Sequence, residues 1–179
     1  MSIFDNLITL DKKGQISYSN WIEWMHVSMG FMHCKTCLAL DKCWFDKHNM
    51  PELPQHEKCH CRAIRIAKPN AYLINAECDI RKFTDYIFSD KYAWNGKSEL
   101  FESLGFDKNE SQYLKDEFEA QAAKNYSEGN YKLNKLDEQG QRINIEIKLN
   151  KNNREIEFIS GWMVKLKGRI TNNTPLADD

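Results

Sequence analysis

The hydrophobic residues follow two different periods in the second half of the chain. From Asp79 to Ser127 they recur at the 3.6-residue spacing of amphipathic helices, which predicts helices over residues 79–88, 98–104 and 112–127. Beyond Gly129 apolar and polar positions alternate, which predicts strands over residues 131–136, 143–149, 156–166 and 169–171. Helices followed by strands with short turns predict an α+β fold, with the helices packed on an antiparallel sheet.

The first half has weaker periodicity. Apolar residues recur at roughly helical spacing over residues 17–29, which predicts a short helix, and residues 62–66 alternate as a short strand. Residues 31–61 show no sustained period and are dense in Cys and His, which is typical of a segment that folds around a metal ion. Lys68-Pro69-Asn70 is the best candidate boundary between two units.

Composition and charge narrow the classes of function. The chain has 179 residues, 41% of them hydrophobic, and can bury one ordinary core or two small ones. A formal net charge of -1 excludes a global basic field, so any nucleic-acid contact must come from a local patch. No run of about 18 apolar residues exists and residues 1–6 lack the features of a secretion signal, so we expect a cytoplasmic protein without membrane insertion.

The cysteines carry the most specific chemical signal. Without a secretion signal the thiols are expected to stay reduced, which favours metal binding over a disulfide framework. Cys34 and Cys37 form a CxxC pair, and a second cluster contains His56, Cys59 and Cys61. A CxxC turn brings two thiolates to one ion, so two of the three later residues must complete a four-ligand shell. The sequence leaves open which two.

Zn²⁺ is the ion that this donor set favours. The ligands are enough to close the shell, which predicts a structural ion rather than a catalytic one, although Glu57 is conceivable as a general base. On an extended segment His60 would point away from Cys59 and Cys61, and Cys43 and Cys78 lie outside the cluster as free thiols. We therefore expect a zinc-binding knuckle unit over residues 1–68, followed by an α+β domain over residues 76–179.

The cysteine segment resembles the C-terminal zinc motif of phage head-morphogenesis proteins of the Mu F-like family. The resemblance spans roughly residues 20–66 and is carried by Cys34-Lys-Thr-Cys37, Leu40-Asp41, Trp44-Phe45 and Pro54-Gln-His56-Glu-Lys-Cys59-His-Cys61. The chain departs from the family pattern at three positions, where Lys42 replaces a Gly, Glu57 a Pro and His60 an Arg. The resemblance implies a zinc site and an association with phages, and it leaves a structural head-completion fragment as one alternative.

The second half is similar to toxin-like domains of the barnase, EndoU, colicin E5/D and RelE nuclease fold. This resemblance spans about residues 79–176 and rests on Lys82-Phe-Thr-Asp-Tyr86, Gly96-Lys97, Phe101-Glu-Ser-Leu-Gly105-Phe106, Gly140-Gln-Arg142, Gly161-Trp162-Met163-Val164, Ile170-Thr171 and Thr174-Pro175-Leu176. It implies a nuclease-like fold and cleavage of RNA without a metal ion. Such an enzyme lets the ribose 2′-OH attack the phosphate, and the protein supplies a base, an acid and cations.

The resemblance points to four candidate catalytic residues. Lys97 or Arg142 would hold the phosphate, Thr171 would donate a hydrogen bond to it, and Tyr92 would act as acid or base. Each is also explained as an ordinary surface group. All five histidines precede Pro69, which excludes a catalytic histidine pair in the second half.

Two functions of different classes follow. The first is an RNA-cleaving toxin or effector of a phage or other mobile element, with RNA as substrate and a cognate immunity or partner protein, acting in the cytoplasm or associated with the virion. The alternative is a noncatalytic, zinc-stabilised adaptor or inhibitor that acts on a phage or host protein and uses the same sheet as its recognition surface.

Overall fold

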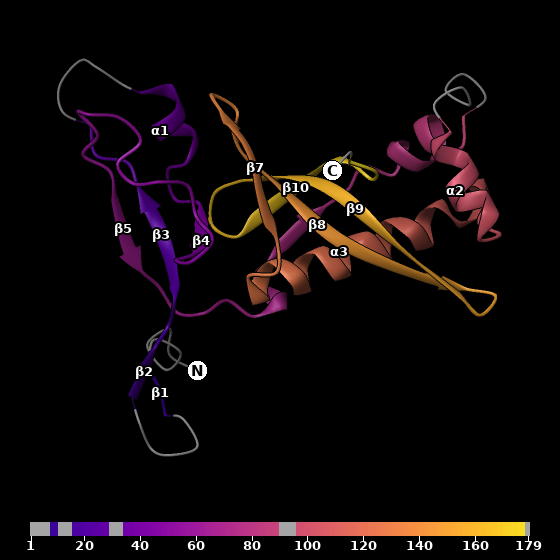
Figure 1. The fold of residues 1–179 in the computed structure, drawn as a ribbon, viewed down its shortest axis with the longest axis horizontal. Coiled ribbons are helices and arrows are strands. Elements are labelled where there is room, and N and C mark those ends of the chain that lie inside the picture. The colour runs from indigo at the N-terminus through magenta and orange to yellow at the C-terminus, as the bar shows by residue number, and fades with distance from the viewer. Residues whose placement is uncertain (1–7, 11–15, 29–33, 90–95, 178–179) are drawn as a thin grey trace.

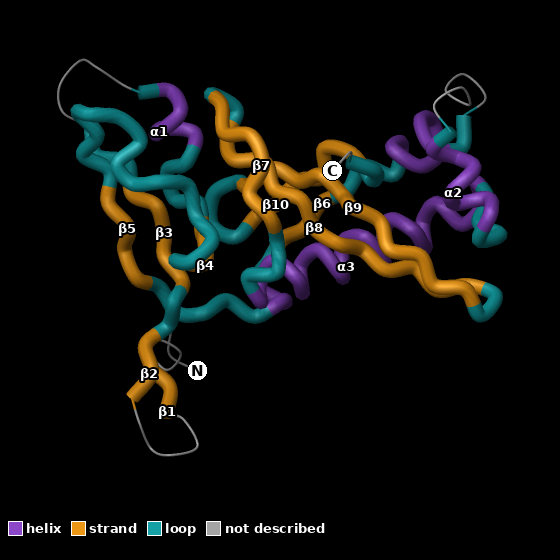
Figure 2. The backbone as a smooth tube through the Cα atoms, in the orientation of Figure 1, coloured by secondary structure: helices purple, strands orange, loops and turns teal. Residues whose placement is uncertain are grey.

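The computed structural model describes residues 8–10, 16–28, 34–89 and 96–177, and these form an α+β protein (Figure 1). Three sheets are present in this part of the chain: a hairpin of β1 (Ile8–Leu10) and β2 (Ile16–Tyr18), a three-stranded sheet, and a five-stranded sheet. The two larger sheets lie in different parts of the molecule, and the long helix α3 (Ser111–Glu128) runs beside the five-stranded one (Figures 1 and 2). The predicted α+β class is confirmed.

The three-stranded sheet has the order β4-β3-β5, with β3 (Trp21–Met25) pairing antiparallel to β4 (Trp44–Asp46) and β5 (Arg62–Arg65). The strand predicted near residues 62–66 is therefore confirmed, while the helix predicted over residues 17–29 is wrong. Aromatic and β-branched residues favour strands, and β3 gains hydrogen-bonded neighbours on both sides, which a short apolar run cannot reveal.

The second half follows the predicted order of helices and then strands. Its helices are the π-helical segment η2 (Lys82–Ile87), α2 (Lys97–Ser103) and α3, whose buried residues Leu114, Phe118 and Ala122 recur every fourth position. Gly129 follows α3 with φ 80°, a left-handed conformation that glycine adopts without a steric penalty. The antiparallel strands that follow are β7 (Lys132–Asp137), β8 (Gly140–Lys151), β9 (Arg154–Val164) and β10 (Arg169–Thr174).

Helix α3 covers one face of the five-stranded sheet. Ile143, Ile145 and Ile147 of β8 are buried on that face, and Phe118 of α3 lies 6.5 Å from Phe158 of β9 between ring centres. Because successive side chains alternate across a sheet, the even-numbered residues of β8 point the other way. We call this side the distal face, and it carries Arg142, Asn144, Glu146 and Lys148 on β8, Glu157, Ile159, Gly161 and Met163 on β9, and Thr171 on β10.

The fifth strand of the larger sheet, β6 (Asn75–Glu77), lies at its edge beside β10. It pairs parallel to β10, so the sheet is mixed rather than wholly antiparallel. Glu77 accepts hydrogen bonds from Arg169 of β10, at 2.8 Å from Nε and 2.6 Å from Nη2. The sequence does not predict β6, because three residues are too few to establish a period.

The Glu77–Arg169 ion pair gives a pH-dependent contribution to stability. The hydrogen bonds from Arg169 lower the pKa of Glu77 below its ordinary value of 4.5. Its contribution is therefore present above about pH 4.5 and lost as the pH falls through the lowered pKa. For this exposed pair we expect about 0.2–1 kcal/mol, reduced by salt. As the pH is lowered, the free energy of unfolding should fall less in Glu77→Gln than in wild type or in the control Glu99→Gln. An equal fall in all three proteins would contradict a stabilising role for the Glu77–Arg169 pair.

The two expected units share one hydrophobic core. Trp21 of β3 packs against Tyr126 of α3 with ring centres 5.6 Å apart, and the Tyr126 hydroxyl donates to the Trp44 carbonyl. Tyr131 accepts a hydrogen bond from the backbone N–H of Asp46 at 3.1 Å. The division into residues 1–68 and 76–179 stays a prediction, and these contacts show that the folded units are packed together.

Candidate metal centre and sheet pocket

Short-range backbone geometry brings the CxxC pair together. Cys34 caps the N-terminus of α1 (Lys35–Ala39), and its Sγ accepts a hydrogen bond from the Cys37 backbone N–H at 3.4 Å. Cys37 is buried on the first turn of this helix, while Cys34 is half-buried. One helical turn therefore holds both sulfur atoms on the same side, as two ligands of one ion require.

Cys37 lies at the centre of the donor cluster. Its Sγ is 3.5 Å from His56 Nε2 and 3.8 Å from Cys59 Sγ. Two groups meet at this residue, Cys34 with Cys37 and His56, and Cys37 with Cys59 and Cys61, and within each group the donor atoms lie within 4.8 Å of one another. The five residues predicted as ligands therefore lie close together and could hold a metal ion. His60 is exposed and belongs to neither group.

His26, which directly follows β3, joins the cluster and was not predicted. Its Nδ1 is 3.6 Å from Cys61 Sγ, and its backbone N–H donates to Asp41 Oδ1 at 2.9 Å. The pairing of Met25 with Arg62 places the residue after β3 beside Cys61. The sequence does show a histidine directly after an apolar segment. Because that segment was predicted as a helix, its strand pairing, which places His26 beside Cys61, could not be foreseen.

Burial and neighbouring thiols separate the cysteine pKa values. Burial, followed by the hydrogen bond with Cys34, raises the pKa of Cys37, and burial followed by Cys59 raises the pKa of Cys61. At Cys59 burial acts upward, but hydrogen bonds from the backbone at Gln55 and Cys61 and from the nearby thiols lower the pKa overall. A metal ion binds thiolates, so its charge would oppose the cost of ionising the buried thiols.

Cys43 and Cys78 are buried away from the cluster. Burial is the largest cause that raises the pKa of each thiol to about 12, so both thiols stay protonated at neutral pH. A buried, protonated thiol behaves as a small apolar side chain. Their placement agrees with the expectation that they are free thiols outside the metal site.

The candidate catalytic residues are distributed over two regions. Arg142 and Thr171 both pair with Met163 of β9, so they lie on either side of it in one row of the distal face. Arg142 Nη2 is 3.1 Å from Asp137 Oδ2. Lys97 begins α2, and its ammonium donates to the Leu176 carbonyl at 3.1 Å. Tyr92 lies outside the described residues.

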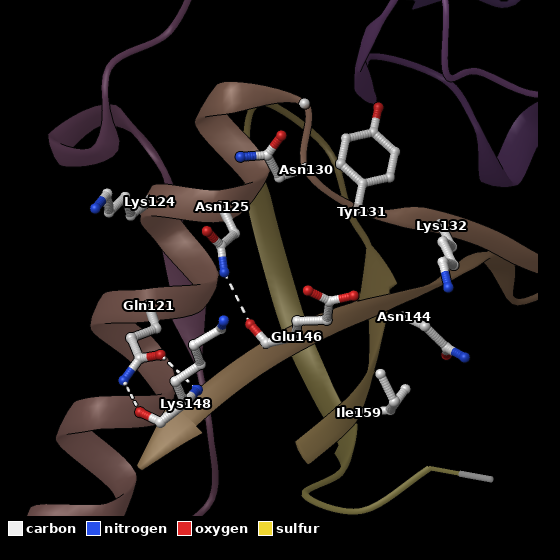
Figure 3. A pocket seen from close by; sticks show the side chains of 11 residues that line it. Gln121, Lys124, Asn125, Asn130, Tyr131, Lys132, Asn144, Glu146, Lys148 and Ile159 are labelled. Carbon is white, nitrogen blue, oxygen red and sulfur yellow. Dashed lines mark hydrogen bonds between the residues drawn. The ribbon is translucent and has the colours of Figure 1, made fainter. Parts of the chain in front are cut away.

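A polar pocket of about 560 Å³ lies at the β8 end of the distal face (Figure 3). It opens where β7 separates from β8, beyond the pairing of Lys132 with Asn144. Three elements contribute its lining, α3, the connection to β7, and the sheet, through Gln121, Lys124, Asn125, Gly129, Asn130, Tyr131, Lys132, Asn144, Glu146, Lys148 and Ile159. The sequence does not mark these residues as a site, because polar positions on a strand are normally solvated.

Two amide side chains of α3 replace the missing neighbour of β8 at the pocket. Gln121 accepts from the Lys148 N–H at 2.8 Å and donates to the Lys148 carbonyl at 2.7 Å, while Asn125 donates to the Glu146 carbonyl at 2.8 Å (Figure 3). These bonds satisfy the strand edge that would otherwise be open. They also hold the backbone of Glu146 and Lys148 in place, so the positions from which these two side chains project are well defined.

The geometry defines an α+β protein with a Cys/His cluster that could hold a metal ion, and with a sheet that carries a pocket lined mainly by polar residues. Residues 69–172, more than half of the chain, match the family described as a domain of unknown function (DUF6883), and the chain belongs to that family. Comparisons with curated proteins and with solved structures found no match. No helix in the described ranges combines the length and hydrophobicity needed to cross a membrane.

Proposed function

We propose that this protein is an RNA-cleaving effector whose first unit is held together by one structural zinc ion. The distal face supports the RNA-cleaving part, since it places Arg142 and Thr171 in one row and the polar pocket two residues further along β8. The resemblance of residues 79–176 to toxin-like nucleases supports a source in a phage or another mobile element.

The spacing of the donors supports zinc. Zinc bonds of about 2.3 Å to sulfur and 2.0–2.1 Å to nitrogen, at a tetrahedral angle, separate two thiolates by about 3.8 Å and a thiolate and an imidazole by about 3.5 Å. Cys37 stands 3.8 Å from Cys59 and 3.5 Å from His56. We assign the shell to Cys34, Cys37, His56 and Cys59, because this set combines the CxxC pair with the two neighbours of Cys37 that stand at these distances. In this assignment Cys61, which lies within 4.8 Å of Cys37 and Cys59, stays outside the shell, next to His26.

The ion has a folding role in this proposal. The loop over residues 47–61 contains no helix or strand, and its residues His56, Cys59 and Cys61 meet Cys37 of α1 at the cluster. When bound, a zinc ion would supply the free energy that orders such a segment. The shell has no place for a substrate, so the cleavage chemistry belongs to the sheet.

Arg142 suits a phosphate-binding role on the distal face. Its guanidinium is always charged and can donate several hydrogen bonds to phosphate oxygens, and the Asp137 contact fixes its position. Thr171 offers a hydroxyl from β10, on the opposite side of Met163 from Arg142. From a strand spacing of about 4.8 Å, the two residues are separated by roughly 10 Å, which is a distance that an RNA backbone can span.

RNA cleavage is tested with a single-stranded RNA and a 2′-O-methyl RNA of the same sequence, with and without Mg²⁺. We expect cleavage of the RNA in both buffers, with 2′,3′-cyclic phosphate ends, and resistance of the methylated strand, because the ribose hydroxyl is the nucleophile. Arg142→Ala should slow cleavage roughly tenfold to 100-fold, since a hydrogen bond to a charged group is worth about 1.5–3 kcal/mol. Intact RNA after incubation with zinc-loaded wild-type protein would refute the proposal.

A noncatalytic adaptor is the second candidate function. It is favoured by the contacts of Lys97 and Arg142, which already bind Leu176 and Asp137 within the chain. Two results together would support this alternative over the nuclease: the absence of RNA cleavage, and tight binding to a partner protein that Ile159→Glu, at a half-buried position of the distal face, abolishes.

A further inference from the structure

Glu146 of β8 places a carboxylate in the pocket. It is exposed on the distal face, and within the described residues its side chain makes no hydrogen bond or ion pair. Figure 3 shows its carboxylate rising from β8 into the space between Asn125, Tyr131 and Lys132. It is the only carboxylate among the residues that line the pocket.

Cations flank this carboxylate on two elements. Lys148 follows two positions later on the same face of β8, and Lys132 of β7 pairs with Asn144, two positions earlier. Lys148 Nζ is 3.0 Å from Glu157 Oε2, and this hydrogen bond raises the pKa of Lys148 and keeps its ammonium charged. Lys124 of α3 also lines the pocket, but Figure 3 shows its ammonium directed away from Glu146. Lys132 and Lys148 therefore bring two ammonium groups to the one carboxylate of the lining, and Lys148 shares its charge with Glu157.

The lining selects ligands by chemistry as well as by charge. Ammonium groups attract a phosphate, and an unpaired carboxylate accepts the proton of a hydroxyl. The amides of Gln121 and Asn125 are already bonded to β8, so they rigidify the wall rather than offer free polar groups. A phosphate ester with an adjacent hydroxyl satisfies both kinds of group, and the ribose 3′-phosphate of RNA has this arrangement.

We infer that the pocket binds a ribose 3′-phosphate of RNA, with Lys132 and Lys148 on the phosphate and Glu146 on the 2′-hydroxyl. This inference rests on the proposed RNA cleavage, for which it supplies the general base. It places the reacting phosphate in the pocket, so that Arg142 and Thr171, in the row of Met163, hold a neighbouring phosphate of the strand. The Glu146 carboxylate accepts the proton of the 2′-OH, the O2′–P bond forms, and the P–O5′ bond breaks. The departing O5′ takes a proton from a water molecule, which leaves a 2′,3′-cyclic phosphate and a 5′-hydroxyl. The lysine ammonium groups stabilise the charge that develops on the phosphate oxygens.

The cleavage experiment compares Glu146→Gln with wild type and with Glu99→Gln, a control at an exposed position of α2 outside the pocket. Loss of a general base typically slows the reaction about 100-fold to 10,000-fold. We expect kcat to fall by at least 100-fold in Glu146→Gln while KM changes little, because the amide keeps the shape of the side chain. Glu99→Gln should behave as wild type. Cleavage by wild type together with an unchanged kcat in Glu146→Gln would overturn the inference and leave the proposed function standing.

A binding experiment tests the pocket when no cleavage occurs. Adenosine 3′-monophosphate and its 2′-deoxy analogue are titrated calorimetrically into the zinc-loaded protein. We expect the ribonucleotide to bind more tightly than the deoxy analogue, and Lys132→Ala to weaken its binding roughly tenfold or more, since a hydrogen bond to a charged group is worth about 1.5–3 kcal/mol. Lys108→Ala on the short helix η4 (Lys108–Glu110) is the matched control. Equal binding by wild type and Lys132→Ala, or no binding at all, would overturn the inference.

Discussion

Substitution of Cys37 by Ser is expected to release the zinc ion and unfold the segment that surrounds it. Cys37 belongs to both donor groups and lies at 3.5 Å and 3.8 Å from two further donors, so its loss removes a ligand in every possible shell. The apparent binding free energy of a structural zinc ion is about 10–16 kcal/mol, and this energy contributes to folding. Elemental analysis should fall from about one zinc per chain toward none, and the near-ultraviolet circular dichroism of Trp21 and Trp24 should weaken.

Two controls make this result specific. Cys78→Ala changes a buried cysteine outside the cluster and should keep the metal, although it loses some packing. Cys61→Ser distinguishes between the shells, because the assignment to Cys34, Cys37, His56 and Cys59 predicts that this variant retains zinc. Full zinc content in both Cys34→Ser and Cys37→Ser would contradict the metal site itself.

Truncation of Tyr126 to Ala is expected to lower the free energy of unfolding by about 3–5 kcal/mol, as for other large buried aromatic residues. Tyr126 is fully buried at the junction of the two units, where it packs edge-on against Trp21 and donates to the Trp44 carbonyl. Tyr126→Phe keeps the ring and leaves that carbonyl without its partner, so we expect a smaller loss of about 1–3 kcal/mol.

Chemical denaturation of the zinc-loaded variants measures these changes. Tyr72→Ala is the matched control, since its side chain is 97% exposed and should change the free energy of unfolding very little. If Tyr126→Ala unfolds in a single transition at lower denaturant concentration than wild type, the two units unfold together even without this side chain. If one unit of Tyr126→Ala unfolds in a separate, earlier transition, the Tyr126 contact is what couples the two units in wild type. If Tyr126→Ala is as stable as Tyr72→Ala, the shared core does not contribute as the structure indicates.

The sequence determined the elements whose signals are long and local. The buried residues of α3 recur at helical spacing over five turns, and β8 alternates over twelve residues, so one period dominates each segment. The CxxC pair was equally predictable because one turn of chain brings both thiols together, and His56, Cys59 and Cys61 follow at metal-binding spacing.

The tertiary structure decided the features that depend on partners distant in sequence. Trp21 and Trp24 suit a helix or a strand, and only pairing with β4 and β5 made the segment a strand and brought His26 to Cys61. The pocket depends on where β7 leaves β8, so no pattern within β8 distinguishes Glu146 from a solvated carboxylate. The local pattern of apolar residues shows which side of a segment is buried. The packing of the whole chain determines which neighbours that side contacts.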